Sequence, residues 1–118
     1  QSLDQINLIN CCAYISVGGS SLGYIQDKYS SWGLTTDDYL KIAKEIHKIE
    51  IVVIIDHIRC GTFSLFYPEI KSNSKQEKKI HSKNIKYAVK KIRDDFNLKC
   101  IGFIIDDNGK LNQVNTEK

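Results

Sequence analysis

Hydrophobic residues along the chain fall into short aliphatic runs that alternate with longer stretches of helical spacing. The runs at residues 11–17, 49–56 and 98–106 are rich in β-branched and aromatic residues, which is typical of strands. Residues 49–56 are nearly all aliphatic, which favours a strand buried on both faces of a parallel sheet. After an Asp-Asn-Gly turn signal, we expect residues 110–114 to return as an edge strand.

Two stretches between these runs have the spacing of amphipathic helices. Residues 35–49 open with threonines and two aspartates, which suit the first turn of a helix, and residues 74–95 carry lysines around an apolar stripe. A short helix is expected at residues 61–67. The positions that we expect to face the core are Tyr39, Ile42, Ala43 and Ile46 in the first long helix, and Ile85, Ala88, Ile92 and Phe96 in the second.

The order of these elements predicts an α/β fold with a mostly parallel sheet and helices on both faces, because strands that alternate with helices are joined by right-handed crossovers. Ligands of such sheets bind beyond the carboxyl ends of the strands. His57 and Cys60 follow the central strand, and Gly18 and Gly19 follow the first strand. These residues are therefore placed where a binding site is expected.

The composition is that of an ordinary globular protein, with 42% hydrophobic and 26% charged residues in 118, and we expect one domain over residues 1–118. The sequence has no bilayer-spanning apolar run and no secretory leader at its start, so a cytoplasmic location is expected. The net charge is +3, and the lysines of residues 71–93 favour a solvated helix face. Because aromatic residues do not alternate with these lysines, we expect no nucleic-acid partner, and because no apolar run could span a bilayer, we expect no membrane partner.

His57 and Cys60 are separated by two residues and could bind one metal ion together. A thiolate and an imidazole suit zinc, which takes four ligands, and Gly61 would let the backbone pass close to a metal or an anion. The alternative is that His57 is a loop residue bonded to the backbone and that Cys60 is a small residue at a helix start. The spacing alone leaves both interpretations open.

The segment "IVVIIDHIRCGTF", residues 51–63, resembles the second half of the zinc site of β-class carbonic anhydrases. The chain is more closely similar to small bacterial proteins related to that class. The similar segments are residues 15–23 with "VGGSS", residues 31–67 from Ser-Trp to the aromatic residues after Cys60, the pair Glu77 and His81, and the closing "DDNGKL". Together they span roughly residues 10–114, nearly the whole chain.

This resemblance implies a Rossmann-like three-layer fold that usually dimerises, and zinc held by two cysteines and one histidine. It also implies reversible hydration of carbon dioxide to bicarbonate, in which zinc lowers the pKa of bound water. His57 matches the zinc-binding histidine of the family, Cys60 its second zinc-binding cysteine, and Gly61 the glycine that follows. The expected partners are carbon dioxide and bicarbonate, or another small anion, and a second copy of the chain.

The chain departs from the family because it has no Cys-x-Asp-x-Arg motif, which carries the first zinc cysteine. Either the chain is an N-terminally shortened form or its lineage has lost the site. Asp56 stands where classical members have glycine, and it could orient the imidazole of His57 or act as a further ligand. Two functions therefore stay open, a zinc-dependent carbonic anhydrase and a non-catalytic scaffold that binds an anion or forms oligomers.

Other residues offer weaker candidates. Glu77 and His81 are four apart, so they share a helix face, where they could form an acid–base or metal pair or simply a packing pair. Gly18 and Gly19 precede two serines and could hold an anion such as bicarbonate through backbone N–H groups. The cysteines are expected to be reduced, with Cys11, Cys12 and Cys100 as small core residues of strands.

Overall fold

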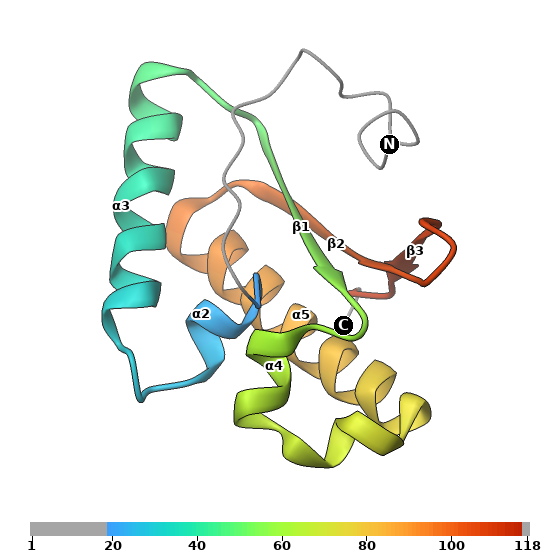
Figure 1. Ribbon diagram of the computed structural model, residues 1–118. Helices are drawn as coiled ribbons and strands as arrows, with labels where there is room; N and C mark the ends of the chain where they lie inside the picture. Colours follow the sequence, from blue (N-terminus) through green and yellow to red (C-terminus); the bar gives the residue numbers. More distant parts are fainter. Residues whose placement is uncertain (1–18, 117–118) are drawn as a thin grey trace.

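A computed structural model describes residues 19–116, so the predicted strand at residues 11–17 and the residues Cys11, Cys12 and Gly18 lie outside the described part. The described elements, shown in Figure 1, are α2 (Leu22–Ile25), α3 (Ser31–Ile46), β1 (Ile51–His57), α4 (Gly61–Phe66), the 3-10 helix η1 (Pro68–Ser72), α5 (Ser74–Phe96), β2 (Lys99–Ile105) and β3 (Leu111–Val114). None of these helices is long and apolar enough to cross a membrane. The prediction of an α/β fold is confirmed.

The sheet has the strand order β1-β2-β3, with β1 parallel to β2 and β2 antiparallel to β3. The predicted edge strand is thus confirmed as β3. The Asp106 carboxylate holds the turn before it, because it accepts hydrogen bonds from the backbone N–H groups of Asn108 at 2.9 Å and Lys110 at 3.0 Å. The described sheet is mixed, with one parallel and one antiparallel pair, rather than mostly parallel.

Helix α5 covers one face of this sheet, and local sequence signals fix both of its ends. Asn73 caps the first turn by accepting a hydrogen bond from the N–H of Gln76, and Asn97 ends the helix in the left-handed conformation. Its predicted apolar stripe is confirmed: Ile85, Ala88, Ile92 and Phe96 are all buried. Close packing against the sheet requires Gly102, where a Cβ atom would lie 2.1 Å from Cγ2 of Ile85.

Helix α3 turns a different face to the core from the one we predicted. It begins at Ser31, earlier than expected, and Leu40 is its buried residue. Tyr39, Ile42 and Ile46 are 53%, 50% and 69% exposed. The prediction was wrong because helical spacing identifies an apolar stripe but not the direction in which the rest of the fold turns it.

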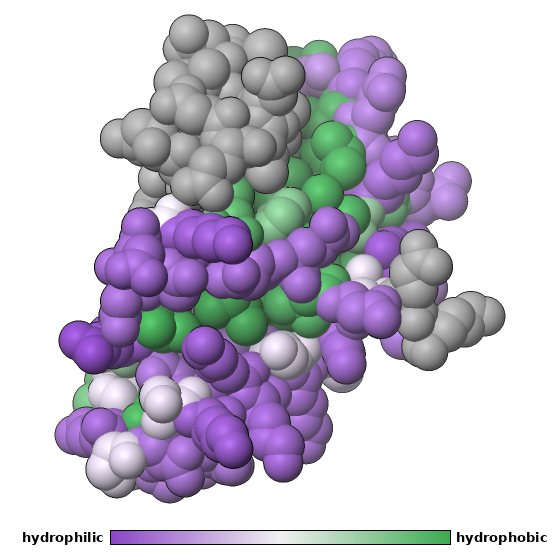
Figure 2. Space-filling view, turned by 90° about the vertical axis from the view of Figure 1, so that its right-hand side faces the viewer, coloured by the Kyte–Doolittle hydropathy of each residue, from purple (hydrophilic) through white to green (hydrophobic). Residues whose placement is uncertain are grey.

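The sheet face opposite α5 is less covered than the sequence predicted. We call it the outer sheet face and define it by alternate residues of the two parallel strands. Its aliphatic residues are partly exposed, and Ile51 is 40% exposed; they are Ile51, Val53, Ile55, Ile101 and Ile105. Figure 2 shows hydrophobic residues gathered in the middle of one side of the molecule. Within residues 19–116, burial of β1 on both faces is therefore a prediction that was wrong.

Candidate functional site

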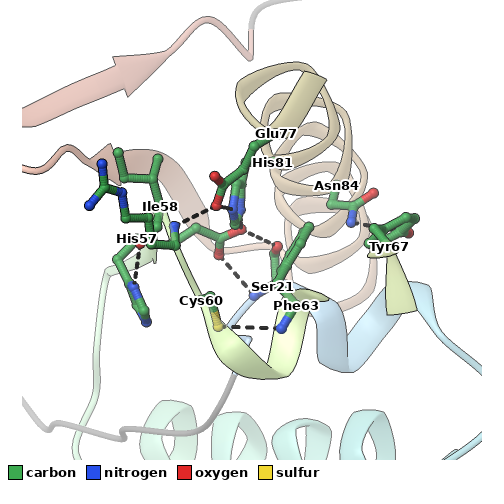
Figure 3. A network of polar contacts seen from close by, with 11 residues as sticks. Ser21, His57, Ile58, Cys60, Phe63, Tyr67, Glu77, His81 and Asn84 are labelled. Carbon is green, nitrogen blue, oxygen red and sulfur yellow. Dashed lines mark hydrogen bonds and ion pairs between the residues drawn. The ribbon is translucent and has the colours of Figure 1, made fainter. Parts of the chain in front are cut away.

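A cluster of polar side chains is buried at the carboxyl end of β1. It comprises Ser21, Asp56, Glu77 and His81, and we call it the Asp56 cluster (Figure 3). The four residues are between 0% and 4% exposed. They come from three segments that are distant in sequence, namely the turn before α2, the end of β1 and the first turns of α5.

Asp56 is the centre of this cluster and accepts three hydrogen bonds. Its Oδ2 atom lies 2.7 Å from Nδ1 of His81 and also accepts a hydrogen bond of 2.7 Å from the hydroxyl of Ser21. Its Oδ1 atom accepts the backbone N–H of Ser21 at 3.1 Å. The carboxylate thus connects the turn before α2 to the first turns of α5, where His81 lies sixty residues after Ser21 in the sequence.

Glu77 closes the other side of the cluster. Its Oε2 atom lies 3.3 Å from Nε2 of His81 and accepts the backbone N–H of Arg59 at 2.5 Å. Arg59 has a positive φ of 59° in the loop after β1. The ring of Phe63 stacks on the imidazole of His81, with the ring centroids 3.9 Å apart. Among the described residues, every buried side-chain nitrogen or oxygen atom has a hydrogen-bond partner.

The arrangement is not a nucleophilic triad. Ser21 donates its hydroxyl to Asp56 rather than to His81, and both imidazole nitrogens face carboxylates. Since His81 is fully buried, it offers no nitrogen to a substrate in solution. The contacts of the Asp56 cluster fix the loop after β1 and the turn before α2 in position.

His57 and Cys60 lie on the other side of that loop. Figure 3 shows both side chains pointing away from His81. The imidazole of His57 is exposed, with Nδ1 2.9 Å from its neighbour's carbonyl oxygen, whereas Cys60 is 5% exposed. The sulfur of Cys60 caps α4 by accepting the N–H of Phe63 at 3.4 Å. A backbone-bonded loop histidine and a cysteine at a helix start are the roles that the alternative interpretation describes.

A zinc ion would need more donors than these two side chains provide. A tetrahedral catalytic centre takes three protein ligands and one water. Within residues 19–116, no group of three or more histidine, cysteine, aspartate or glutamate side chains could hold a metal ion. The described residues therefore do not fit a complete zinc centre.

Asp56 does not occupy the place that the sequence suggested for it. We expected it to orient the imidazole of His57 or to act as a further metal ligand, but its carboxylate bonds to His81 and Ser21. The turn at Gly19, where we expected backbone N–H groups to bind an anion, also differs from the prediction. Gly19 makes its turn at a φ of +79°, and the N–H of Ser21 beyond it is taken by the protein's own carboxylate.

Gly61 begins α4 and is exposed, and a Cβ atom there would meet no atom within 4 Å. Its packing therefore does not require a glycine. Glu77 and His81 do share a helix face, as predicted, and the structure shows that this face is buried. Sequence reasoning missed the link between His81 and Asp56. A signal was present, because the apolar stripe of α5 continues at helical spacing from Ile85 back to His81.

No family model matches the sequence. The chain is 31% identical over 114 residues to an uncharacterized protein of Rickettsia conorii, an alignment that covers 95% of this chain and 61% of that protein. It is 28% identical over 114 residues to an uncharacterized protein of Rickettsia bellii, with 95% of this chain and 70% of that protein covered. The chain thus spans about three fifths of the length of the first of these relatives.

Proposed function

We propose that this chain is a β-carbonic-anhydrase-like domain whose function is assembly rather than catalysis: its outer sheet face joins two copies into a homodimer. The observation that carries the proposal is the partly exposed aliphatic surface of β1 and β2, with Ile51 at 40% exposure. Aliphatic side chains left partly exposed on one sheet face are a candidate interaction surface.

The partly exposed outer sheet face supports the three-layer arrangement that belongs to this proposal. Helix α5 packs on the opposite face of the sheet, so the outer sheet face is left for a third layer. We propose that a second copy of the chain supplies this layer.

The state of the Asp56 cluster supports a structural role for this end of the sheet. All of its polar groups are paired, and the thiol of Cys60 is engaged as a helix cap. Every buried side-chain nitrogen or oxygen atom of the described residues has a hydrogen-bond partner within the protein.

The assembly is tested by the mass of the protein in solution. Ile101→Lys would place a charge on the outer sheet face, and Leu65→Lys is the matched control because Leu65 is 77% exposed on α4 instead. We expect light scattering after gel filtration to give a dimer for the wild type and the control, and a monomer for Ile101→Lys. Circular dichroism and thermal unfolding would confirm that each variant is folded. A folded wild-type monomer at all concentrations would contradict the proposal.

The second candidate function is the zinc-dependent hydration of carbon dioxide that the resemblance implies. It is favoured by one observation: His57 and Cys60 both point away from the Asp56 cluster, on the same side of the loop. Further ligands would have to come from outside the described residues, from Cys11 or Cys12, or from a second copy.

Elemental analysis of the reduced protein distinguishes the two candidates. Stoichiometric zinc that is lost in both His57→Ala and Cys60→Ser, together with carbon dioxide hydration in a stopped-flow assay, would establish the enzyme. His47→Ala is the matched control, because His47 is an exposed histidine at the end of α3. The assembly proposal predicts no zinc dependence of folding or mass in any of these proteins.

A further inference from the structure

The first half of α5 presents a surface of lysines, which we call the lysine face. Its members are exposed and, with Ser82, line one shallow hollow; they are Lys75, Lys78, Lys79, Lys83 and Lys86. Figure 2 shows hydrophilic residues covering the lower part of the molecule, where Figure 1 places the beginning of α5. The opposite side of the same helix is the buried stripe that packs on the sheet.

No ion pair among the described residues neutralises the lysine face. Within residues 19–116, none of its five lysines forms an ion pair, whereas Lys90 and Lys91 in the second half of α5 pair with Asp94 at 2.6 Å and Asp95 at 2.5 Å. The one acidic residue among the lysines, Glu77, points inward to His81. In the part of the chain that the structure describes, the stretch from Lys75 to Lys86 therefore exposes positive charge that no ion pair compensates, unlike Lys90 and Lys91.

We propose that the lysine face binds the phosphate backbone of double-stranded DNA without reading its sequence. From Lys75 to Lys86 the helix rises by roughly 17 Å. This length is enough to reach across a major groove about 12 Å wide, from one phosphate backbone to the other. Lysine ammonium groups on flexible stems suit such contacts, which carry affinity but no sequence information.

The surroundings of the lysine face favour a duplex over other anionic partners. The residues that line the hollow are lysines and one serine, so no aromatic side chain lies among them on which single-stranded bases could stack. A helix that enters a membrane surface needs an exposed apolar face, and the apolar stripe of α5 is buried in the core. The sequence expectation of no nucleic acid rested on the mild net charge, on the lysines being typical of a solvated helix face and on the absence of alternating aromatic residues. The aromatic criterion applies to single strands.

Fluorescence anisotropy with a labelled 20-base-pair DNA duplex tests the proposal on the full 118-residue chain. The affinity should fall as salt rises, with a log–log slope of about −4 to −5 for five phosphate contacts. Lys79→Gln/Lys83→Gln should weaken binding by at least about tenfold at low salt and reduce the slope by roughly 2. Lys90→Gln/Lys91→Gln removes the same charge from the same helix at paired positions and should bind like the wild type.

Three results would overturn the proposal. The first is that the chain does not bind the duplex at 50 mM salt. The second is that both double variants weaken binding equally, which would indicate an effect of net charge rather than of this surface. The third is that the chain binds phosphatidylserine vesicles but not the duplex. The substitutions lie on exposed side chains, so unchanged circular dichroism is expected for all proteins. Because neither double variant changes the outer sheet face, the DNA-binding proposal and the dimer proposal are tested independently.

Discussion

Replacing Asp56 by asparagine tests whether the Asp56 cluster holds the loop after β1 and the turn before α2 together. Asparagine has nearly the same shape, so the change alters hydrogen bonding and charge but leaves packing intact. The carboxylate accepts three hydrogen bonds, from the N–H and hydroxyl of Ser21 and from Nδ1 of His81, at 2.7 to 3.1 Å.

An asparagine side chain has one oxygen, which can accept hydrogen bonds, and one NH2 group, which can only donate them. If the oxygen faces His81, the NH2 group faces the backbone N–H of Ser21, so two donors meet. In the reverse orientation the NH2 group faces Nδ1 of His81 instead. At least one buried donor loses its acceptor, which costs about 1–3 kcal/mol. His81 also loses the carboxylate that it contacts at 2.7 Å, so we expect a total loss of about 2–4 kcal/mol.

Urea denaturation followed by circular dichroism measures this loss as a shift in the free energy of unfolding. Asp94→Asn is the control, because Asp94 pairs with Lys90 on the exposed side of α5, and its loss should cost no more than about 0.5 kcal/mol. If the free energy of unfolding of Asp56→Asn is within about 0.5 kcal/mol of that of Asp94→Asn, the Asp56 cluster does not hold these segments together.

Three further predictions follow from other parts of the fold. Gly102→Ala should destabilise the protein by about 1–3 kcal/mol in the same denaturation assay, because its Cβ would lie 2.1 Å from Ile85; an unchanged midpoint would contradict the close packing of α5 on β2. Burial raises the pKa of the Cys100 thiol to about 12, so iodoacetamide at pH 8 should leave it unmodified in the native protein and modify it in urea, as read by mass spectrometry. Hydrogen bonds from the backbone N–H of Lys110 and its neighbours lower the pKa of Asp106 in the folded protein. Its contribution to stability is therefore present above the unfolded pKa of about 3.9 and is lost as pH falls through the lower folded pKa. Asp106→Asn should remove that part of the acid sensitivity of unfolding, and equal acid unfolding profiles of the two proteins would contradict this.

The parts of the fold that depend on local sequence could be predicted from it. The β-branched runs gave β1 and β2 to within two residues at their ends, and the stripe from Ile85 to Phe96 gave the buried face of α5. Helix α3 shows the limit of this reasoning. Its stripe at Tyr39, Ile42 and Ile46 is real, but the contacts of Leu40 with the core decide which side of the helix is buried.

The candidate site was predicted less well, because it depends on contacts between distant segments. His57 and Cys60 are close in sequence, which drew attention to them, yet the buried polar residues gather around Asp56 and His81, which are 25 positions apart. The orientation of Asp56 follows from the alternation of side chains along β1, which turns it to the same face as Ile54 and away from His57. Which helix meets that face could not be read from spacing alone.

Sedimentation equilibrium of the wild-type chain tests the central proposal most directly. A homodimer joined through the outer sheet face predicts a mass of about 27 kDa, twice the 13.5 kDa of one chain, that falls to the mass of one chain in Ile101→Lys. A mass of 13.5 kDa for the folded wild type across the concentration range, or a dimer that Ile101→Lys leaves intact, would contradict it.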